Sequence, residues 1–190
     1  PGGAADTARV VGEEGCFFVV PIPDIDRPTS HPTIGVDAAG GVHVAFAPDT
    51  DTTEDPTRPA YYAYCPSSCT SAAAFTVLPL GERVDYANLA LDEAGHPRIV
   101  LRRTRPSDLK LVYEYWACDG NCTNGANWTS VAVAEAFPRP VASGEPFSRF
   151  FALDGAGRPR FVYLDAGADS EDPHRGVFYA GCDDDCSNAA

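Results

Sequence analysis

A pair of cysteines four positions apart occurs three times in this chain, and each pair ends a similar stretch of sequence. The three stretches begin GVDAAGGVHVAF, LALDEAGHPRIV and FALDGAGRPRFV, and their aspartates, Asp37, Asp92 and Asp154, lie 55 and 62 residues apart. A repeat of this length is typical of an array of small, similar structural units. The repeats cover approximately residues 33–80, 86–134 and 148–190.

Each repeat predicts four short antiparallel strands. A first strand (33–37, 88–92 or 150–154) leads into an Asp-x-x-Gly turn, where glycine provides the positive φ that a tight turn needs. The second strand (42–47, 98–103 or 160–164) is rich in β-branched and aromatic residues. A third strand ends at the cysteine turn, and a fourth begins at Phe75 or Trp128. No segment has a convincing helical period, so the predicted class is all-β.

The third repeat lacks its fourth strand, because only four residues follow Cys186. A similar strand lies at the other end of the chain, where FFVVPIPDI (residues 17–25) resembles the fourth strands FTVLPLGE and WTSVAVAEA. We therefore predict that the N-terminal strand, residues 17–22, completes the last unit, either in the same chain or in a second copy.

The repeats LALDEAGHPRIV and FALDGAGRPRFV resemble those of secreted bacterial β-propellers. This resemblance implies four-stranded blades, with residues 1–190 forming a single propeller domain or part of one. It says little about function, and the chain lacks the Ser-x-Asp-x-Gly-x-Thr-Trp box of sialidases. Propellers close with four to eight blades. Three blades therefore need a second copy or the remainder of a longer propeller, while an open stack would leave sheet edges uncovered.

The cysteine pairs have two interpretations, disulfides and metal ligands. Disulfides are predicted at Cys65–Cys69, Cys118–Cys122 and Cys182–Cys186, since the repeated pairs suit a turn in an oxidising compartment. Metal sites normally need a second ligand pair nearby, which this chain lacks. We therefore expect a secreted or cell-surface protein. Cys16 is left unpaired, which leaves a partner outside the chain, a cysteine in a missing segment, or a buried thiol.

The net charge of −13 argues against binding to nucleic acid or to anionic membranes, because both require clustered basic residues. No apolar run is long enough to span a membrane. A single lysine beside 13 arginines, with no methionine, indicates a bacterial, GC-rich source.

The long, irregular loops are predicted to gather at the end of the array opposite the Asp-x-x-Gly and cysteine turns. Two of them are acidic, and they are either calcium or ligand sites or simply solvated hairpin tips. The residues concerned are Asp49, Asp51 and Asp55 in one loop, and Asp165, Asp169 and Asp172 in the other. His31 and His174 are the histidines predicted near this end. The basic cluster there is expected to pair with an acidic loop of a neighbouring unit or to bind an anion, and it comprises Arg102, Arg103 and Arg105.

Three function classes remain open. The preferred hypothesis is a non-catalytic extracellular binding or assembly module with a protein or carbohydrate partner, functioning as a homo-oligomer. The first alternative is a polysaccharide hydrolase or lyase that uses loop carboxylates. The second is a structural subunit of a surface polymer. No nucleophile elbow, phosphate-binding loop or zinc-protease motif is present, so no residue is predicted to be catalytic.

Overall fold

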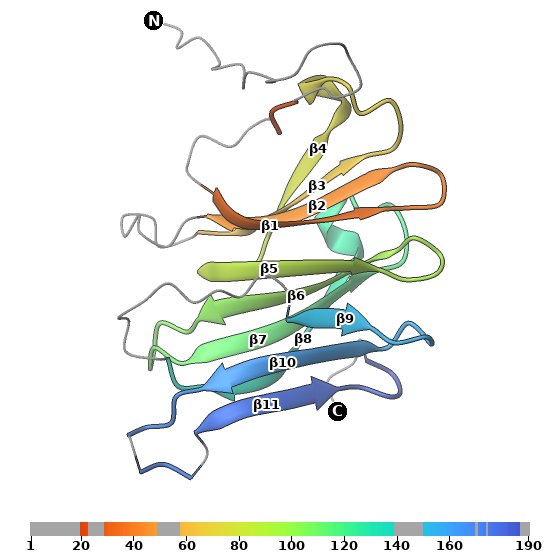
Figure 1. The fold of residues 1–190 in the computed structure, drawn as a ribbon. Helices are drawn as coiled ribbons and strands as arrows, with labels where there is room; N and C mark the ends of the chain where they lie inside the picture. The colour runs from red at the N-terminus through yellow and green to blue at the C-terminus, as the bar shows by residue number, and fades with distance from the viewer. Residues whose placement is uncertain are drawn as a thin grey trace, which may run out of the picture.

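The computed structural model describes residues 20–22, 29–48, 58–138, 150–169, 171–173 and 175–186 of the 190-residue chain. These residues form three antiparallel sheets of four, four and three strands. Helical structure in the described part is limited to two short 3-10 turns. Figure 1 shows the sheets stacked in sequence order, from sheet 1 in orange and yellow to sheet 3 in blue. The prediction of an all-β fold is confirmed.

Sheet 1 has its strands in sequence order, β1 (Thr29–Val36), β2 (Val42–Pro48), β3 (Ala60–Cys65) and β4 (Thr76–Leu80). The 3-10 turn η1 (Ala72–Ala74) precedes β4. The strand β1 begins earlier than residue 33, and its register with β2 shifts between Ser30 and Thr33. His31 lies at this irregularity with φ of 53°. A bulge of this kind interrupts the alternation of side chains, which explains why the sequence pattern began only at Thr33.

Sheet 2 repeats this order with β5 (Val84–Leu91), β6 (Pro97–Thr104), β7 (Leu111–Cys118) and β8 (Trp128–Ala136). The 3-10 turn η2 (Gly125–Asn127) precedes β8, as η1 precedes β4. A second register shift lies between Val84 and Tyr86 on β5. The first strands of sheets 1 and 2 therefore both carry a bulge near the same end.

Sheet 3 contains three strands among the described residues, β9 (Phe151–Leu153), β10 (Pro159–Asp165) and β11 (Gly176–Gly181). Its free edge is β11, where a fourth strand was expected. Of the predicted N-terminal strand, residues 17–19 lie outside the described part, and residues 20–22 are described without strand structure. In Figure 1 residues 20–22, in red, lie beside sheet 1, at the opposite end of the stack from β11. They therefore do not complete sheet 3 of the same chain.

Each sheet has two faces, which we call leading when directed toward the next sheet in sequence and trailing when directed toward the previous one. Between sheets 1 and 2, the leading face of sheet 1 packs on the trailing face of sheet 2 to form a buried apolar cluster. Its members are Ala45, Ala47, Ala60, Tyr62 and Leu80 from sheet 1, and Val84, Ala87, Leu89, Ile99, Leu101, Cys118 and Trp128 from sheet 2. Alternation along β5 and β6 directs the other side chains of sheet 2 to the next interface.

The interface between sheets 2 and 3 is the second apolar cluster. It contains Tyr86, Val100, Leu111, Tyr113, Tyr115, Ala117 and Ala136 from sheet 2, and Phe150, Phe151 and Phe161 from sheet 3. Both interfaces are therefore built alike, with aromatic and β-branched side chains of successive sheets interdigitating. This burial is the main stabilising contribution to the stack.

The hairpin turns and the longer loops lie at opposite ends of the stack. The turns β1–β2, β5–β6 and β9–β10 project on the right of Figure 1, and the connections β6–β7 and β10–β11 lie on the left. We call these the turn end and the loop end. No described helix is long and apolar enough to cross a membrane.

Candidate functional site

The aspartate of each repeat organises the turn that follows it. Asp92 Oδ1 accepts hydrogen bonds from Ala94 N at 3.0 Å and His96 N at 2.8 Å. Asp37 and Asp154 make the same two bonds with the residues two and four positions later. The turn glycine, Gly95 in this repeat, has φ of 83°. Glycine adopts this conformation without strain, which accounts for the Asp-x-x-Gly pattern.

A cation six residues after the aspartate ties the turn to its sheet. Arg98 Nη2 lies 2.7 Å from Asp92 Oδ2 and 2.6 Å from Asp119 Oδ1 in the cysteine turn. Arg160 pairs with Asp154 and Asp183 in the same way, at 2.7 and 2.5 Å. The Asp-x-x-Gly and cysteine turns therefore lie at one end, as the sequence predicted. In sheet 1 this position is His43, whose Nε2 lies 3.3 Å from Asp37 Oδ2.

Hydrogen bonds and cations shift the pKa values of these groups. The backbone N–H of Arg158 is the largest influence on Asp154 and, with Ala156 N and the Arg158 side chain, lowers its pKa to about 2. The N–H of Gly41 and the His43 side chain likewise lower the pKa of Asp37. Burial lowers the pKa of His43 despite the nearby Asp37 carboxylate. The aspartates are thus held ionised, and His43 is held neutral.

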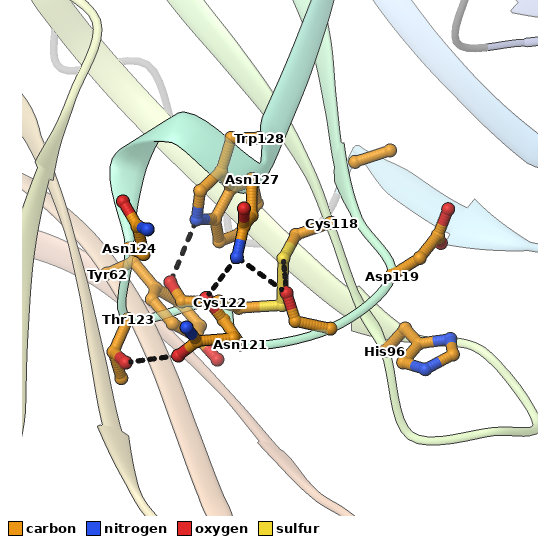
Figure 2. The surroundings of a disulfide bond; sticks show 12 residues. Tyr62, His96, Cys118, Asp119, Asn121, Cys122, Thr123, Asn124, Asn127 and Trp128 are labelled. Carbon is orange, nitrogen blue, oxygen red and sulfur yellow. Dashed lines mark hydrogen bonds between the residues drawn. A yellow bond between two sulfur atoms is a disulfide. The ribbon is translucent and has the colours of Figure 1, made fainter.

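The three predicted cysteine pairs are all at bonding distance. Their S–S separations are 2.15, 2.09 and 2.18 Å, and their Cα atoms are 5.6 to 5.8 Å apart. Figure 2 shows the surroundings of Cys118–Cys122, where Trp128 Nε1 donates to Cys122 O at 2.9 Å. Asn127 Nδ2 donates to the carbonyl oxygens of Gly120 and Asn121, each at 3.1 Å. Each disulfide therefore closes one turn. Hydrogen bonds from Asn127 and Trp128 also join the Cys118–Cys122 turn to the start of β8.

One group of described residues has the spacing of a metal site, namely Asp92, His96 and Asp119 at the turn end. Arg98 Nη2 already contacts the carboxylates of Asp92 and Asp119. The guanidinium supplies the positive charge that a metal ion would bring. The arrangement is therefore explained as an ion-paired turn.

The leading faces show a sharp contrast between the internal sheets and sheet 3. The tyrosine three positions before the first cysteine is Tyr62, Tyr115 and Tyr179 in the three repeats. Its exposure is 0 % and 4 % in the first two, but 67 % at Tyr179. Val177 is likewise 71 % exposed and Val162 41 %, although their equivalents in sheets 1 and 2 are buried. Those equivalents are Ala60, Tyr113, Ala45 and Val100.

The trailing face of sheet 1 is exposed along β1 and covered elsewhere. Ile34 and Val36 are 63 % and 61 % exposed, whereas Leu89, the equivalent of Ile34 in sheet 2, is 9 % exposed. Toward β2 and β3 the face is buried as a third apolar cluster, against which Ile22 packs. The buried members of this cluster are Val44, Phe46 and Ala63. The exposed strip is therefore confined to the first strand of the sheet.

The loop end brings together three side chains from two sheets. The ring of His31 lies 4.6 Å from that of Tyr86, and Arg102 Cζ lies 4.0 Å from the centroid of the same ring. Nearby on the β5 bulge, Asp85 accepts a hydrogen bond from Thr104 Oγ1 at 2.8 Å. Burial raises the pKa of Asp85, opposed by the surrounding arginines and Thr104. Asp85 was not anticipated from the sequence, where nothing but its acidity marked it.

A cavity of about 590 Å³ opens at the loop end between sheets 2 and 3. Arg102 and Tyr113 line it from sheet 2, and Leu164 and Asp165 line it from sheet 3. Phe137 from the end of β8 completes the apolar wall. Its mixed apolar and charged lining is suited to a small polar ligand, without selecting a chemical class.

The carboxylates of the acidic β10–β11 loop accept hydrogen bonds from backbone amides of this loop and from Phe137 N, which follows β8. Asp165 Oδ1 accepts from Phe137 N and Gly167 N, both at 2.9 Å. Asp172 Oδ2 accepts from Ala168 N at 2.8 Å, and Asp169 Oδ1 from Glu171 N at 2.9 Å. The structure does not bring these three carboxylates together as a metal-ligating group among the described residues. Five other residues singled out from the sequence, Asp49, Asp51, Asp55, Cys16 and His174, lie outside the described part.

Two arginines of the basic cluster, Arg103 and Arg105, have carboxylate partners within their own sheet and hairpin. Arg103 Nε lies 2.5 Å from Glu114 Oε1 across the β6–β7 pair. Arg105 contacts Asp108 at 2.6 Å and also binds Glu135. The expectation of partners from a neighbouring unit is therefore wrong for these two arginines. Glu114 on β7, Glu135 on β8 and Asp108 in the β6–β7 connection supply these carboxylates.

Two polar side chains that the sequence analysis missed join the first strands of adjacent sheets. Thr33 Oγ1 accepts a hydrogen bond from Leu89 N at 3.0 Å. Asn88 Oδ1, which is buried, accepts one from Phe150 N at 3.3 Å. Both residues occupy the position four before the repeat aspartate, and this shared position was the available signal.

Comparison of the chain with protein-family models, with curated proteins and with solved structures finds no match in any of the three. The geometry of the faces, turns and loops is therefore what bears on function.

Proposed function

We propose that this chain is a non-catalytic, extracellular assembly module. It forms part of a disulfide-stapled β-propeller, joins further blades through the two end faces of its stack, and presents its loop end to a protein or carbohydrate partner. Each sheet is one blade in this proposal. The stack of three is fewer than the four to eight blades with which propellers close, so further blades must join it.

The observation that carries the proposal is the exposure of Tyr179 and Val177 on the leading face of sheet 3. The equivalent side chains in sheets 1 and 2 are buried by the sheet that follows. A sheet whose outer face ended the folded structure would be expected to carry polar residues there, as terminal repeats of arrays do. Sheet 3 instead retains the apolar residues of an internal blade.

Two further observations support a binding and assembly role outside the cytosol. Local disulfides in all three sheets are typical of oxidising compartments. The described carboxylates of the β10–β11 loop accept hydrogen bonds from loop amides, a structural use that fixes a surface loop. A loop of this kind on a rigid sheet is suited to recognition.

Light scattering of the purified chain tests the proposal. The wild-type protein is expected to form an assembly of two or more copies, each of 20.2 kDa. Val177→Glu places a charge in the leading face and should shift the mass toward the monomer. Leu109→Glu is the matched control, because Leu109 is 62 % exposed but lies in the β6–β7 connection. A wild-type protein that stays monomeric at every concentration, or an assembly unaffected by Val177→Glu, would contradict the proposal.

A further inference from the structure

The turn glycines show how one repeat contacts the next. A Cβ atom on Gly95 would lie 3.0 Å from the Cβ of Asp37 in the preceding sheet. A Cβ atom on Gly157 would lie 3.8 Å from that of Asp92. Gly40 holds the same position in sheet 1, and a Cβ atom there would meet no described residue within 4 Å. The first repeat therefore lacks the preceding aspartate, while Asp154 in the last repeat lacks a following glycine.

The first strands pair small side chains with large ones. A Cβ atom on Gly35 would lie 2.8 Å from Leu91 Cγ, so the glycine makes room for the leucine. Ala90 and Leu153 occupy the same positions between sheets 2 and 3 and pack on the same cluster. The unpaired members of the series are Ala152 on sheet 3 and Val36 on sheet 1. If Ala152 of one copy lies opposite Val36 of another, this contact again places a small side chain against a larger one.

The tyrosines of the leading faces contact aromatic rings of the next sheet. Tyr62 meets Trp128 at the start of β8 edge-on, with ring centroids 5.1 Å apart, and Tyr115 meets Phe151 of the first strand β9 at 6.3 Å. Tyr179 is the third of these tyrosines. Ile34 is the sheet 1 residue at the position of Phe151, and both Tyr179 and Ile34 are exposed.

Residues 20–22 lie where the outermost strand of a preceding blade belongs. In the aligned segments FFVVPI and FTVLPL, Ile22 corresponds to Leu80. Leu80 packs with Ile99 and Leu101 of the following sheet. Ile22 packs with Val44 and Phe46, which hold the positions of Ile99 and Leu101 in sheet 1. Sheet 1 thus carries the fourth-strand residues that sheet 3 lacks.

We propose that two copies of this chain associate head to tail as a closed ring of six blades, a proposal that rests on the assembly function above. The leading face of sheet 3 in each copy packs on the exposed β1 strip of the other. Residues 20–22 of the second copy then lie on the β11 side of sheet 3 of the first. The interface brings Tyr179 against Ile34, Ala152 against Val36 and Asp154 against Gly40.

A second copy is the occupant that these contacts favour. The two open faces belong to one chain, are of opposite type, and continue the register of the two internal interfaces. Three sheets from each of two copies give six blades, within the range of four to eight in which propellers close. The two contacts are then identical, because a two-fold axis through the centre of the ring relates them. No end face is left unpaired.

Paired charge variants test both the partner and its orientation. Ile34→Glu or Tyr179→Lys alone should weaken dimerisation by about tenfold or more, because each variant alters both contacts of the ring. An equimolar mixture of the two should form a heterodimer, with one unaltered contact and one contact that pairs the two introduced charges. Circular dichroism of each variant checks that the sheets remain folded, and Leu109→Glu is again the control.

The outcomes separate this inference from the proposed function. A dimer broken by only one of the two variants would show contact between like faces and overturn the head-to-tail ring. Assembly at any stoichiometry other than two would also overturn it, while leaving an assembly role in place. In a Cys16→Ser background, Ile34→Cys mixed with Tyr179→Cys should give a disulfide-linked dimer. Absence of this cross-link from an otherwise dimeric protein would contradict the predicted register.

Discussion

The Nδ1 atom of His43 lies 2.7 Å from the hydroxyl oxygen of Tyr62, inside the interface between sheets 1 and 2. Both side chains are almost fully buried. On its other side the imidazole faces the carboxylate of Asp37. A neutral ring that donates to Asp37 and accepts from Tyr62 satisfies all three groups.

His43 is expected to make stability depend on pH. Its pKa is lowered in the folded protein by burial, so the unfolded chain takes up a proton first as the pH falls below about 6.5. The stability that neutral His43 contributes is therefore present above this value and is lost as the pH falls toward the folded pKa. His43→Leu should remove this dependence and cost about 1–3 kcal/mol at neutral pH, because the Tyr62 hydroxyl loses its partner. Urea unfolding between pH 5 and 8 measures both effects, and an unchanged pH profile in the variant would contradict them.

The turn aspartates should act in a lower pH window. The pKa of Asp154 is about 2, below its usual 3.8. Its contribution is complete above pH 3.8 and is lost as the pH falls toward 2. Asp154→Asn retains the acceptor for Ala156 N and Arg158 N but has no charge to titrate, so the variant should lose less stability than wild type between pH 4 and 2. Equal acid sensitivity of the two proteins would show that other carboxylates dominate.

Gly35 should tolerate no side chain. In Gly35→Ala the new methyl group meets Leu91, and overpacking of this kind costs about 1–3 kcal/mol. Gly155→Ala is the matched control, because a Cβ there lies more than 4 Å from its surroundings in the described part of the chain. Thermal unfolding should show that Leu91→Val partly rescues Gly35→Ala, giving a non-additive cycle. Additive effects of the two substitutions would place the strain elsewhere.

The disulfides should stabilise turns without holding the sheets together. Closing a five-residue loop contributes about 2 kcal/mol by the chain-entropy estimate. Replacing Cys118 and Cys122 together by alanine should therefore lower the unfolding free energy by about that amount and leave the β-sheet circular dichroism spectrum intact. Collapse of the spectrum on this replacement would mean that the turn is required for the fold.

Much of the fold follows from local patterns that repeat. The Asp-x-x-Gly turns, the strands that flank them and the cysteine turns were predicted because turn glycines, β-branched runs and paired cysteines each have a local physical cause. The bulges at His31 and Asp85 were not, because a register shift depends on the partner strand. The hydrogen bonds of Thr33 and Asn88 were also missed, since they form between sheets that are more than 50 residues apart in sequence.

The candidate site was predicted less well than the scaffold. The sequence predicted ligand sites in the acidic loops, yet Asp165 and Asp172 accept hydrogen bonds from the backbone amides of Gly167 and Ala168 in their own loop. Charge alone does not distinguish a carboxylate that binds a ligand from one that holds a turn. The end faces became apparent only when exposure at equivalent positions was compared, as for Tyr62 and Tyr179.

The leading face of sheet 3 and the trailing face of sheet 1 differ, and this difference determines what would form if the proposed ring did not close. A head-to-tail contact forms a ring when the rotation between successive sheets sums to a full turn, and an open filament when it does not. In the proposed ring, this rotation would depend on how closely the first strands of successive sheets approach, as where Gly35 lies against Leu91. If the proposed ring forms, a substitution that widens this contact would leave both end faces intact and would be expected to give a fibre in place of a discrete particle.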